Sequence, residues 1–322
     1  MYTRILTVIL ILVVAATIVG SRFLDLPNNG RLWGEVQNFA HMPYFGLLSL
    51  AFLALSRRLL SSRVNSVYTH YIIAFFVAAS IGLVDEIVQI ASPRDADITD
   101  WLRDIGGSLS FLGLHLSLDR RTESARSSWP PRARELIISG SALIIIVVSV
   151  PVGLWSWAFI QRNSTFPEIC GFESYWENRF VTAKHAGLSI TPVPPTWKEA
   201  RGEHVGRVTF YPADFPGFAI EEPYPDWSGY RFFSFRVFSE LDKPRTLTVR
   251  VEDFEHTGDI TDRFTGVYTV LPGDNEVNIP IAEIRVAPAA RDLDISAVRA
   301  INFYLKSPKD SIALYFDNIA VR

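Results

Sequence analysis

The first half of the chain consists of long apolar runs separated by short polar connections. About 20 consecutive apolar residues are enough for a helix to cross a lipid bilayer. The pattern therefore predicts five membrane-spanning helices, over Ile5–Val19, Phe39–Leu55, Tyr71–Ile90, Trp101–Leu118 and Leu136–Ile160. The first run could instead be a signal peptide, but we expect a retained helix because further spans follow. The fourth run is short and carries Asp104, so we expect it to be tilted or sheltered by its neighbours.

From Phe166 onward the pattern changes to short runs in which apolar and polar residues alternate. In Arg245–Asp253 and Ala300–Lys306 every second residue is apolar, which is typical of strands with one face in a core. Similar runs cover Val205–Tyr211, Tyr230–Phe238, Thr265–Leu271, Glu276–Ile281 and the stretch from Ile312 to Val321. The alternation places these residues on the outer side: Thr246, Thr248, Arg250, Glu252, Asn302, Tyr304 and Lys306. In the last strand the apolar positions change parity, so we expect a bulge near Asp317 and Asn318.

The two patterns together predict a multi-domain protein, with an α-helical polytopic membrane domain followed by an all-β jelly-roll sandwich. Residues 1–120 contain the first four predicted membrane helices. Residues 121–134 form a basic linker, 135–161 the fifth helix, and 162–322 the sandwich.

The arginines predict an orientation for these helices. They crowd the second and fourth connections, whereas the first and third connections carry two each. Because basic residues favour the cytoplasmic side, the amino terminus and the even-numbered connections are predicted to be cytoplasmic. After five spans, everything beyond Gln161 is then extracytoplasmic.

Composition adds two limits. The net charge of −3 argues against a nucleic-acid partner, because phosphate binding needs a concentrated basic surface. Cys170 is the single cysteine, so no disulfide can form within the chain. We expect Cys170 to be an inert residue at the edge of the β-domain.

The most unusual stretch is Gly82–Gly113, where acidic residues stand between two membrane-grade runs. With the predicted topology, polar residues from three helices meet at one membrane face, and Asp85 and Gln89 share a helical side. This predicted membrane polar cluster consists of His41, Asp85, Glu86, Gln89, Arg94, Asp100 and Asp104. It could be a catalytic or proton-relay site, a site for a polar head group, or a network that only fixes helix packing. A metal bound by His41, Asp85 and Glu86 is a weaker alternative, because the spacing is not that of a metal motif.

The same residues carry a family resemblance. The His in FAHMPYFGLLSL, the sequence DEIVQ, the following Pro-Arg and the acid-rich turn before Gly106 resemble the VanZ-like family of bacterial membrane proteins, over residues 39–118. The resemblance implies a multi-pass protein of the bacterial inner membrane with a role in the cell envelope. Family members are associated with tolerance to glycopeptide antibiotics, and no reaction is established for them.

A second resemblance covers residues 170–322. The sequences GFESYW, VRVED, VLPGDNEVNIPI and LYFDNIAV are similar to carbohydrate-binding modules of the galactose-binding-like type. This resemblance implies a glycan-binding sandwich. It also implies that Glu173 and Asp317 stand where such modules hold a structural calcium ion, for which carboxylates are suitable ligands. No other cofactor is expected.

Glycan-binding residues are sought in the long polar segment Asp253–Phe264 and among the aromatic residues. The candidates are Asp253, His256, Asp262, Arg263, Trp227 and Tyr268. Trp176, Trp197, Tyr211 and Tyr304 are further rings that could stack on a sugar. The alternative is structural, because most aromatic side chains in a small sandwich belong to its core and an ion pair such as Asp262–Arg263 could simply hold the segment in place.

The sequence therefore predicts a membrane protein whose partners are the lipid bilayer and an envelope polysaccharide or lipid-linked glycan. Binding without catalysis is favoured, since neither GxSxG nor HExxH occurs in the chain. A membrane enzyme acting on such a lipid and a purely structural anchor are the alternatives.

Overall fold

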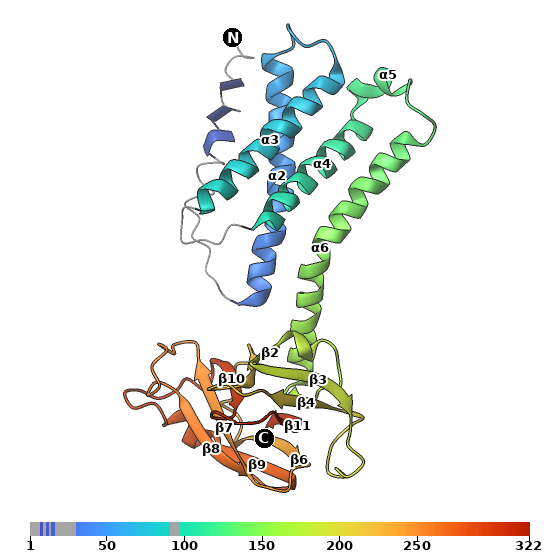
Figure 1. Cartoon of the computed structure of the whole chain (residues 1–322). Coiled ribbons are helices and arrows are strands. Elements are labelled where there is room, and N and C mark those ends of the chain that lie inside the picture. The colour runs from blue at the N-terminus through green and yellow to red at the C-terminus, as the bar shows by residue number, and fades with distance from the viewer. Residues whose placement is uncertain (1–6, 9–10, 13, 17–29, 91–96) are drawn as a thin grey trace. The chain divides into compact units, whose positions relative to one another are not determined.

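The computed structural model describes residues 7–8, 11–12, 14–16, 30–90 and 97–322 (Figure 1). They divide into two compact units, Met1–Trp155 and Ser156–Arg322. The predicted division into a helical part and an all-β sandwich is confirmed. Each unit is described by itself.

The first unit is built from helices. These are α2 (Arg31–Leu59), α3 (Val67–Ile90), α4 (Ile98–Leu118), η1 (Arg120–Thr122), α5 (Glu123–Arg126) and α6 (Ala133–Thr165), the last of which continues into the second unit. Within the described residues, α2, α3 and α6 are long and apolar enough to cross a membrane. The predicted fourth span does form a helix, α4, but it does not meet that measure. Most of the predicted first span lies outside the described residues, so three of the five predicted spans are supported.

Helices α2, α3 and α4 pack side by side (Figure 1). The closest approach joins α2 and α4, where a side chain at Gly107 would meet the Met42 carbonyl oxygen, which lies 2.1 Å from the ideal Cβ position. Small residues at helix contacts let backbones approach closely, which is how membrane helices gain packing contacts. Gly107 is therefore required by the packing of α2 against α4.

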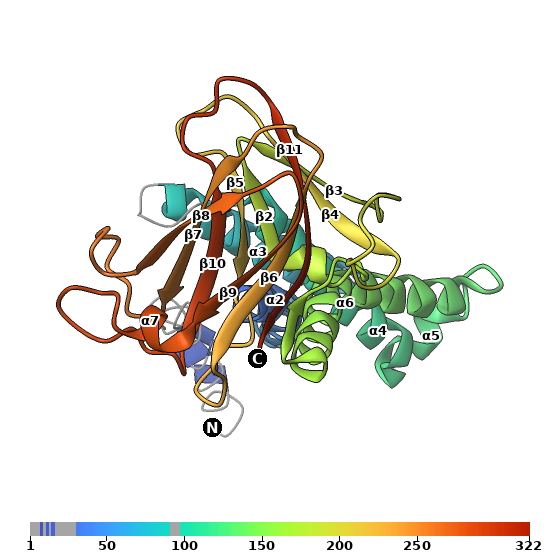
Figure 2. The same ribbon diagram turned by 90° about the horizontal axis from the view of Figure 1, so that it is seen from below.

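The second unit is a sandwich of two antiparallel sheets, which Figure 2 separates with β7, β8 and β10 on the left and β3, β4 and β11 on the right. One sheet has the order β3-β4-β11-β6-β9, with β1 paired to β11, and the other has the order β2-β5-β10-β7-β8. The strands are β1 (Glu168–Cys170), β2 (Val181–Lys184), β3 (Ala186–Pro192), β4 (His204–Phe210), β5 (Gly217–Glu221), β6 (Phe232–Ser239), β7 (Arg245–Asp253), β8 (Phe264–Val270), β9 (Gly273–Pro280), β10 (Val298–Tyr304) and β11 (Ile312–Val321). Two short helices, η2 (Glu177–Arg179) and α7 (Ile281–Arg285), complete the unit.

Aromatic side chains fill the space between the sheets. Phe235 from one sheet and Phe303 from the other meet edge to face with 5.1 Å between ring centroids. Phe316 of β11 contacts Phe303 as well, at 5.6 Å. Each of these rings is at most 1% exposed. Burial of such rings is the main favourable contribution to the stability of a sandwich of this size.

The predicted bulge in the last strand is confirmed. The register of β11 against β6 shifts between Asp317 and Ala320, and Asn318 adopts a positive φ of 51°. This irregularity lets both halves of β11 direct apolar side chains into the core despite their opposite parity.

Cys170 is buried at the start of the sandwich. It lies in β1, which pairs with β11, and it is only 1% exposed. Burial raises the pKa of its thiol well above the ordinary value, so the thiol is unreactive as expected.

Candidate functional site

The structure brings part of the predicted membrane polar cluster together. His41 of α2 lies with its Nδ1 3.0 Å from Oδ1 of Asp104 on α4, and its Nε2 lies 4.0 Å from Oδ2 of Asp100. Asp104 is only 1% exposed, and Gly82 of α3 leaves the space that its carboxylate occupies. Since a carboxylate only accepts hydrogen bonds, it favours the tautomer of His41 with the proton on Nδ1.

The other members of the cluster have partners of their own or lie elsewhere. Glu86 of α3 accepts a hydrogen bond of 3.0 Å from the backbone N–H of Asp97, and Asp100 pairs with Arg103 one turn along α4. Asp85 and Gln89 lie half-buried on α3. Arg94 lies outside the described residues. The contacts therefore join His41, Asp100 and Asp104 directly, with Glu86 beside them on the neighbouring helix.

In the sandwich, the segment Asp253–Phe264 is held in place by ion pairs. Arg291 reaches Asp253 at 2.5 and 2.7 Å and Asp262 at 2.6 Å. The side chain of Asp253 is completely buried. Hydrogen bonds from Arg291 and from the Thr257 N–H hold the pKa of Asp262 at about 2. Asp253 and Asp262 thus serve the structure of this segment, and the cation is Arg291 where the sequence suggested Arg263.

Two aromatic candidates also require correction. Trp227 is fully buried, stacks on Phe233 at 5.2 Å and donates its indole N–H to the Tyr224 carbonyl. It offers no ring face to a sugar. Tyr268 pairs in register with Leu247, which places it on the core-facing side of β8, and burial together with Glu283 raises its pKa to about 12.

Polar side chains also cluster on a different surface of the sandwich. This surface is the outer side of the five-stranded sheet. Register pairs Asn302 of β10 with Arg250 of β7 and with Ala219 of β5. Glu252 and Tyr304 follow on the same side, and Arg263 comes just before β8 next to Glu252. We call this surface the polar face, and it consists of Gly217, Ala219, Thr248, Arg250, Glu252, Arg263, Ala300, Asn302 and Tyr304.

The small residues form the floor of the polar face. Gly217 of β5 lies against β10, where a Cβ would stand 2.1 Å from the Phe303 carbonyl oxygen. Ala219 and Ala300 continue this low floor beside Asn302. Tyr304 stands at one end with the exposed ring of Phe215 against it at 5.8 Å. Small residues, polar side chains and aromatic rings therefore lie next to one another on this side of the sheet.

Two donors of the polar face lack acceptors. Within the described chain, the Nε atom of Arg263 and the Nδ2 atom of Asn302 are buried and form no hydrogen bond. Arg250 is held differently, because its Nε lies 2.6 Å from Oε1 of Glu252 and forms an ion pair with it. A buried donor left without an acceptor costs about 1–3 kcal/mol.

The pKa of Arg250 is also shifted on the polar face. Burial lowers the pKa of Arg250, Glu252 opposes that change, and the nearby positive charge of Arg263 adds to it. His256 packs above Glu252, with 3.5 Å between its Nε2 and Oε1, and 2.7 Å separates its Nδ1 from the Asp262 carbonyl oxygen. Of the predicted glycan-binding residues, Arg263 therefore belongs to the polar face and His256 adjoins it.

The residues proposed for calcium lie in a carboxylate-rich corner. Burial and the negative charges of Glu168 and Glu173 raise the pKa of Asp317 to about 6, although the N–H groups of Arg201 and Asn318 oppose this. Burial also acts to raise the pKa of Glu173, but hydrogen bonds from His204 and the Glu203 N–H outweigh it and leave the pKa lowered. Carboxylate oxygens are suitable ligands for Ca²⁺. Among the described residues, however, no group of three or more metal-binding side chains lies close enough together to hold a metal ion.

Comparison with known proteins gives similarities for the sandwich. No family model matches the chain, and no curated protein matches it. The predicted VanZ-like relationship is therefore unsupported by these comparisons and stays a prediction.

Among solved structures, the sandwich is similar to an exo-beta-agarase, at 16% identity and a TM-score of 0.40, covering 48% of this chain and 24% of that one. A Family 11 Carbohydrate-Binding Module from Clostridium thermocellum, in complex with a mixed-linked tetrasaccharide, gives 17% identity and a TM-score of 0.37 over 48% of this chain and 93% of the module. The CBM22-1 xylan-binding domain of Paenibacillus barcinonensis Xyn10C gives 15% and 0.33, over 47% and 90%.

Proposed function

We propose that the protein is a membrane-held glycan-binding protein of the bacterial cell envelope. Its sandwich binds a polysaccharide through the polar face, and its apolar helices keep that sandwich at the membrane. The observation that carries the proposal is the pair of buried donors without acceptors at Arg263 and Asn302, next to the ion pair of Arg250 and Glu252.

Sugars match this surface chemically. Every hydroxyl of a sugar can accept a hydrogen bond and donate one, so neighbouring hydroxyls can satisfy guanidinium and amide donors while Glu252 accepts in return. The C–H face of a pyranose ring can lie on the ring of Tyr304 or Phe215. A ligand that supplies the missing acceptors removes the energetic cost that the free sandwich carries, which favours binding.

The test uses the sandwich alone, residues 165–322, in affinity electrophoresis through gels that contain envelope polysaccharides. The wild-type domain should be retarded. Asn302→Ala and Arg250→Gln should lose most of this retardation. Asn278→Ala and Arg207→Gln change the same residue types on strands of the other sheet and should behave like the wild type. Equal retardation of all four variants would refute the polar face as the binding site.

A second candidate function concerns the helical unit. His41 paired with the buried Asp104 could engage the head group of a lipid-linked glycan, as the VanZ-like reading suggests, or exchange a proton with it. Under this hypothesis the protein is an enzyme or a lipid receptor of the inner membrane. The variants Asp104→Asn and His41→Gln would distinguish these alternatives. In an enzyme they should abolish turnover of a lipid-linked substrate, whereas in a receptor they should abolish only retention of the lipid-linked glycan.

The calcium proposal is tested separately. If Glu173 and Asp317 hold a cation, calcium should raise the melting temperature of the sandwich, and EDTA should reverse the rise. Asp317→Asn removes one charged ligand and should abolish the response. A melting temperature that calcium leaves unchanged would dismiss the site without affecting the glycan proposal.

A further inference from the structure

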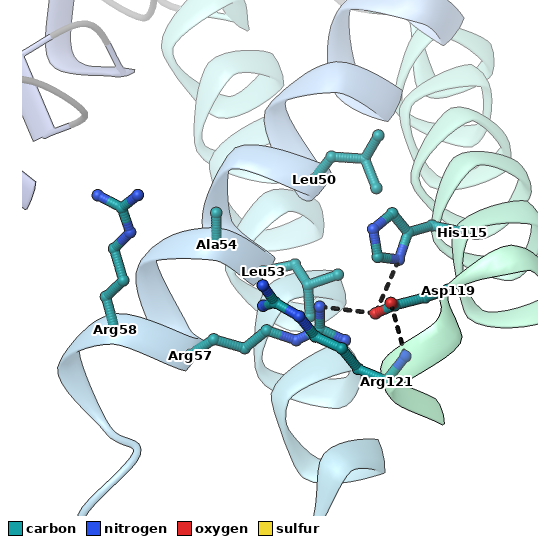
Figure 3. A pocket seen from close by; sticks show the side chains of 8 residues that line it. All are labelled: Leu50, Leu53, Ala54, Arg57, Arg58, His115, Asp119 and Arg121. Carbon is teal, nitrogen blue, oxygen red and sulfur yellow. Dashed lines mark hydrogen bonds and ion pairs between the residues drawn. The ribbon is translucent and has the colours of Figure 1, made fainter. Parts of the chain in front are cut away.

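A cavity of about 490 Å³ opens between the ends of α2 and α4 (Figure 3). Three of its lining residues are apolar, namely Leu50, Leu53 and Ala54, and the other five are polar or charged, namely Arg57, Arg58, His115, Asp119 and Arg121. Along α2, 16 residues separate Arg57 from His41. At 1.5 Å per residue this is about 24 Å. The cavity is thus remote from the polar cluster around His41.

One arginine of the cavity is already neutralised. Nη1 of Arg57 lies 2.9 Å from Oδ2 of Asp119, and its Nη2 donates to the Tyr71 hydroxyl at 3.1 Å. That hydroxyl in turn lies 2.8 Å from Nδ1 of His115. Arg57 is therefore held in position as part of the cavity wall.

The other two arginines are not neutralised. The guanidinium groups of Arg58 and Arg121 form no ion pair and no hydrogen bond with any residue that the structure describes, and both side chains are exposed. The backbone N–H of Arg121 does donate to Oδ1 of Asp119. In Figure 3 Arg121, which belongs to η1 just after α4, extends toward α2, and Arg58 stands apart from the Asp119 contacts. Three arginines against the single carboxylate of Asp119 leave two positive charges at this cavity.

The apolar side of the cavity continues along the helix. Leu47, Leu50, Ala54 and Arg58 follow each other at intervals of three or four residues, so they share one side of α2. Leu47 is 62% exposed. An apolar stripe that ends in a cation matches a ligand with an alkyl chain and an anionic head, and the ends of membrane helices are where such heads lie.

We propose that this cavity binds an anionic phospholipid, with the phosphate of its head group between Arg58 and Arg121 and an acyl chain along Leu50, Ala54 and Leu47. A free phosphate ion would use the two guanidinium groups but not the apolar stripe. A zwitterionic lipid would use the stripe but carries its own cation beside the phosphate. The site is independent of the glycan proposal.

The experiment uses the full-length protein in detergent, equilibrated with equal amounts of phosphatidylglycerol and phosphatidylcholine and analysed by native mass spectrometry. The wild-type protein should retain phosphatidylglycerol in preference. Arg58→Gln with Arg121→Gln should reduce that preference on the order of tenfold. The matched control, Arg63→Gln with Arg120→Gln, changes two nearby exposed arginines that do not line the cavity and should leave it intact.

Three results would overturn the proposal. They are equal retention of both lipids by the wild type, equal loss in the two double variants, and complete displacement of the lipid by millimolar inorganic phosphate, which would assign the site to a soluble anion. If the glutamine variant does not elute as a single species in size exclusion, Arg58→Lys with Arg121→Lys replaces it. The lysine variant keeps both charges and should keep the preference.

Discussion

At the scale of single residues, Arg250 and Asn302 occupy positions that a sandwich optimised for stability alone would fill differently. Both side chains come from central strands of their sheet. Nδ2 of Asn302 is buried and forms no hydrogen bond with the described residues, and Nε of Arg250 is paired with Oε1 of Glu252 at 2.6 Å. A buried donor without a partner in a native structure calls for an explanation, and under the proposed function the polar face exchanges some stability for binding.

This exchange predicts the effect of Asn302→Leu. The substitution removes the unsatisfied amide and keeps the side-chain size, so the free energy of unfolding of the isolated sandwich should rise by about 1 kcal/mol. Polysaccharide binding should be lost in the same variant. Urea unfolding and affinity electrophoresis measure the two effects. A variant that is both less stable and fully competent in binding would contradict the role given to Asn302.

Arg291→Gln should lower the free energy of unfolding of the sandwich. It leaves the fully buried Asp253 without its cation, and breaking such a pair costs roughly 3 kcal/mol. The variant should therefore unfold at lower urea concentration at pH 7, while Arg285→Gln, in an exposed pair with Asp292, should change little.

The same network predicts a pH dependence. The pKa of Asp262 is about 2 in the folded domain, below its ordinary 3.8, so its stabilising contribution is complete above pH 3.8 and is lost as the pH falls toward 2. In Arg291→Gln this acid-dependent loss should be smaller. Unfolding curves measured from pH 5 to pH 2 would show it, and parallel losses in the variant and the wild type would contradict the assignment.

At the scale of elements, alternation and apolar length predicted much of the structure. The bounds of β7 agree with the prediction, and the outer positions Arg250, Glu252, Asn302 and Tyr304 follow from simple parity. Strands β1, β2, β3 and β5 escaped prediction because they are short or rich in small and polar residues. Pairing with neighbours, which local sequence does not reveal, stabilises them.

The candidate site was less predictable for a physical reason. Parity tells which side of a sheet a residue faces, but not whether neighbouring side chains satisfy it. Arg291, which neutralises Asp253 from 38 residues away, could not be paired with it from spacing. The sequence therefore placed most glycan-binding candidates in the loop Asp253–Phe264 and not on the adjoining strands. The charged and polar residues at outer positions of β7 and β10 were the sequence signal that could have indicated the polar face.

The helical elements yield a prediction about Gly107. A methyl group at this position would collide with the Met42 backbone, and neither helix can yield locally. Gly107→Ala should therefore destabilise the packing of α2 and α4 by about 1–3 kcal/mol. Gly140→Ala, where a Cβ meets open space on α6, is the matched control and should be neutral or slightly stabilising. Thermal size-exclusion profiles of the full-length protein compare the two, and equal melting would contradict the packing argument.

At the scale of the whole molecule, the arginine distribution and the apolar helices lead to a topology. Three described helices could cross a membrane. The sequence predicts five spans with a cytoplasmic amino terminus, and this topology would place the sandwich outside the cytoplasm. Tyr175 is 93% exposed, so Tyr175→Cys should react with a membrane-impermeant thiol reagent in intact spheroplasts. Arg63→Cys should react only after permeabilisation. The buried Cys170 stays silent in both. The reverse pattern would contradict this orientation.

The central claim is that the sandwich binds a glycan through its polar face. NMR titration of the isotope-labelled sandwich, residues 165–322, with oligosaccharides released from the envelope tests it residue by residue. The account predicts that backbone signals of Gly217, Ala219, Ala300 and Asn302 shift progressively and reach saturation, while those of β3 and β4 stay in place. Absence of shifts with every oligosaccharide, or shifts confined to the other sheet, would contradict it.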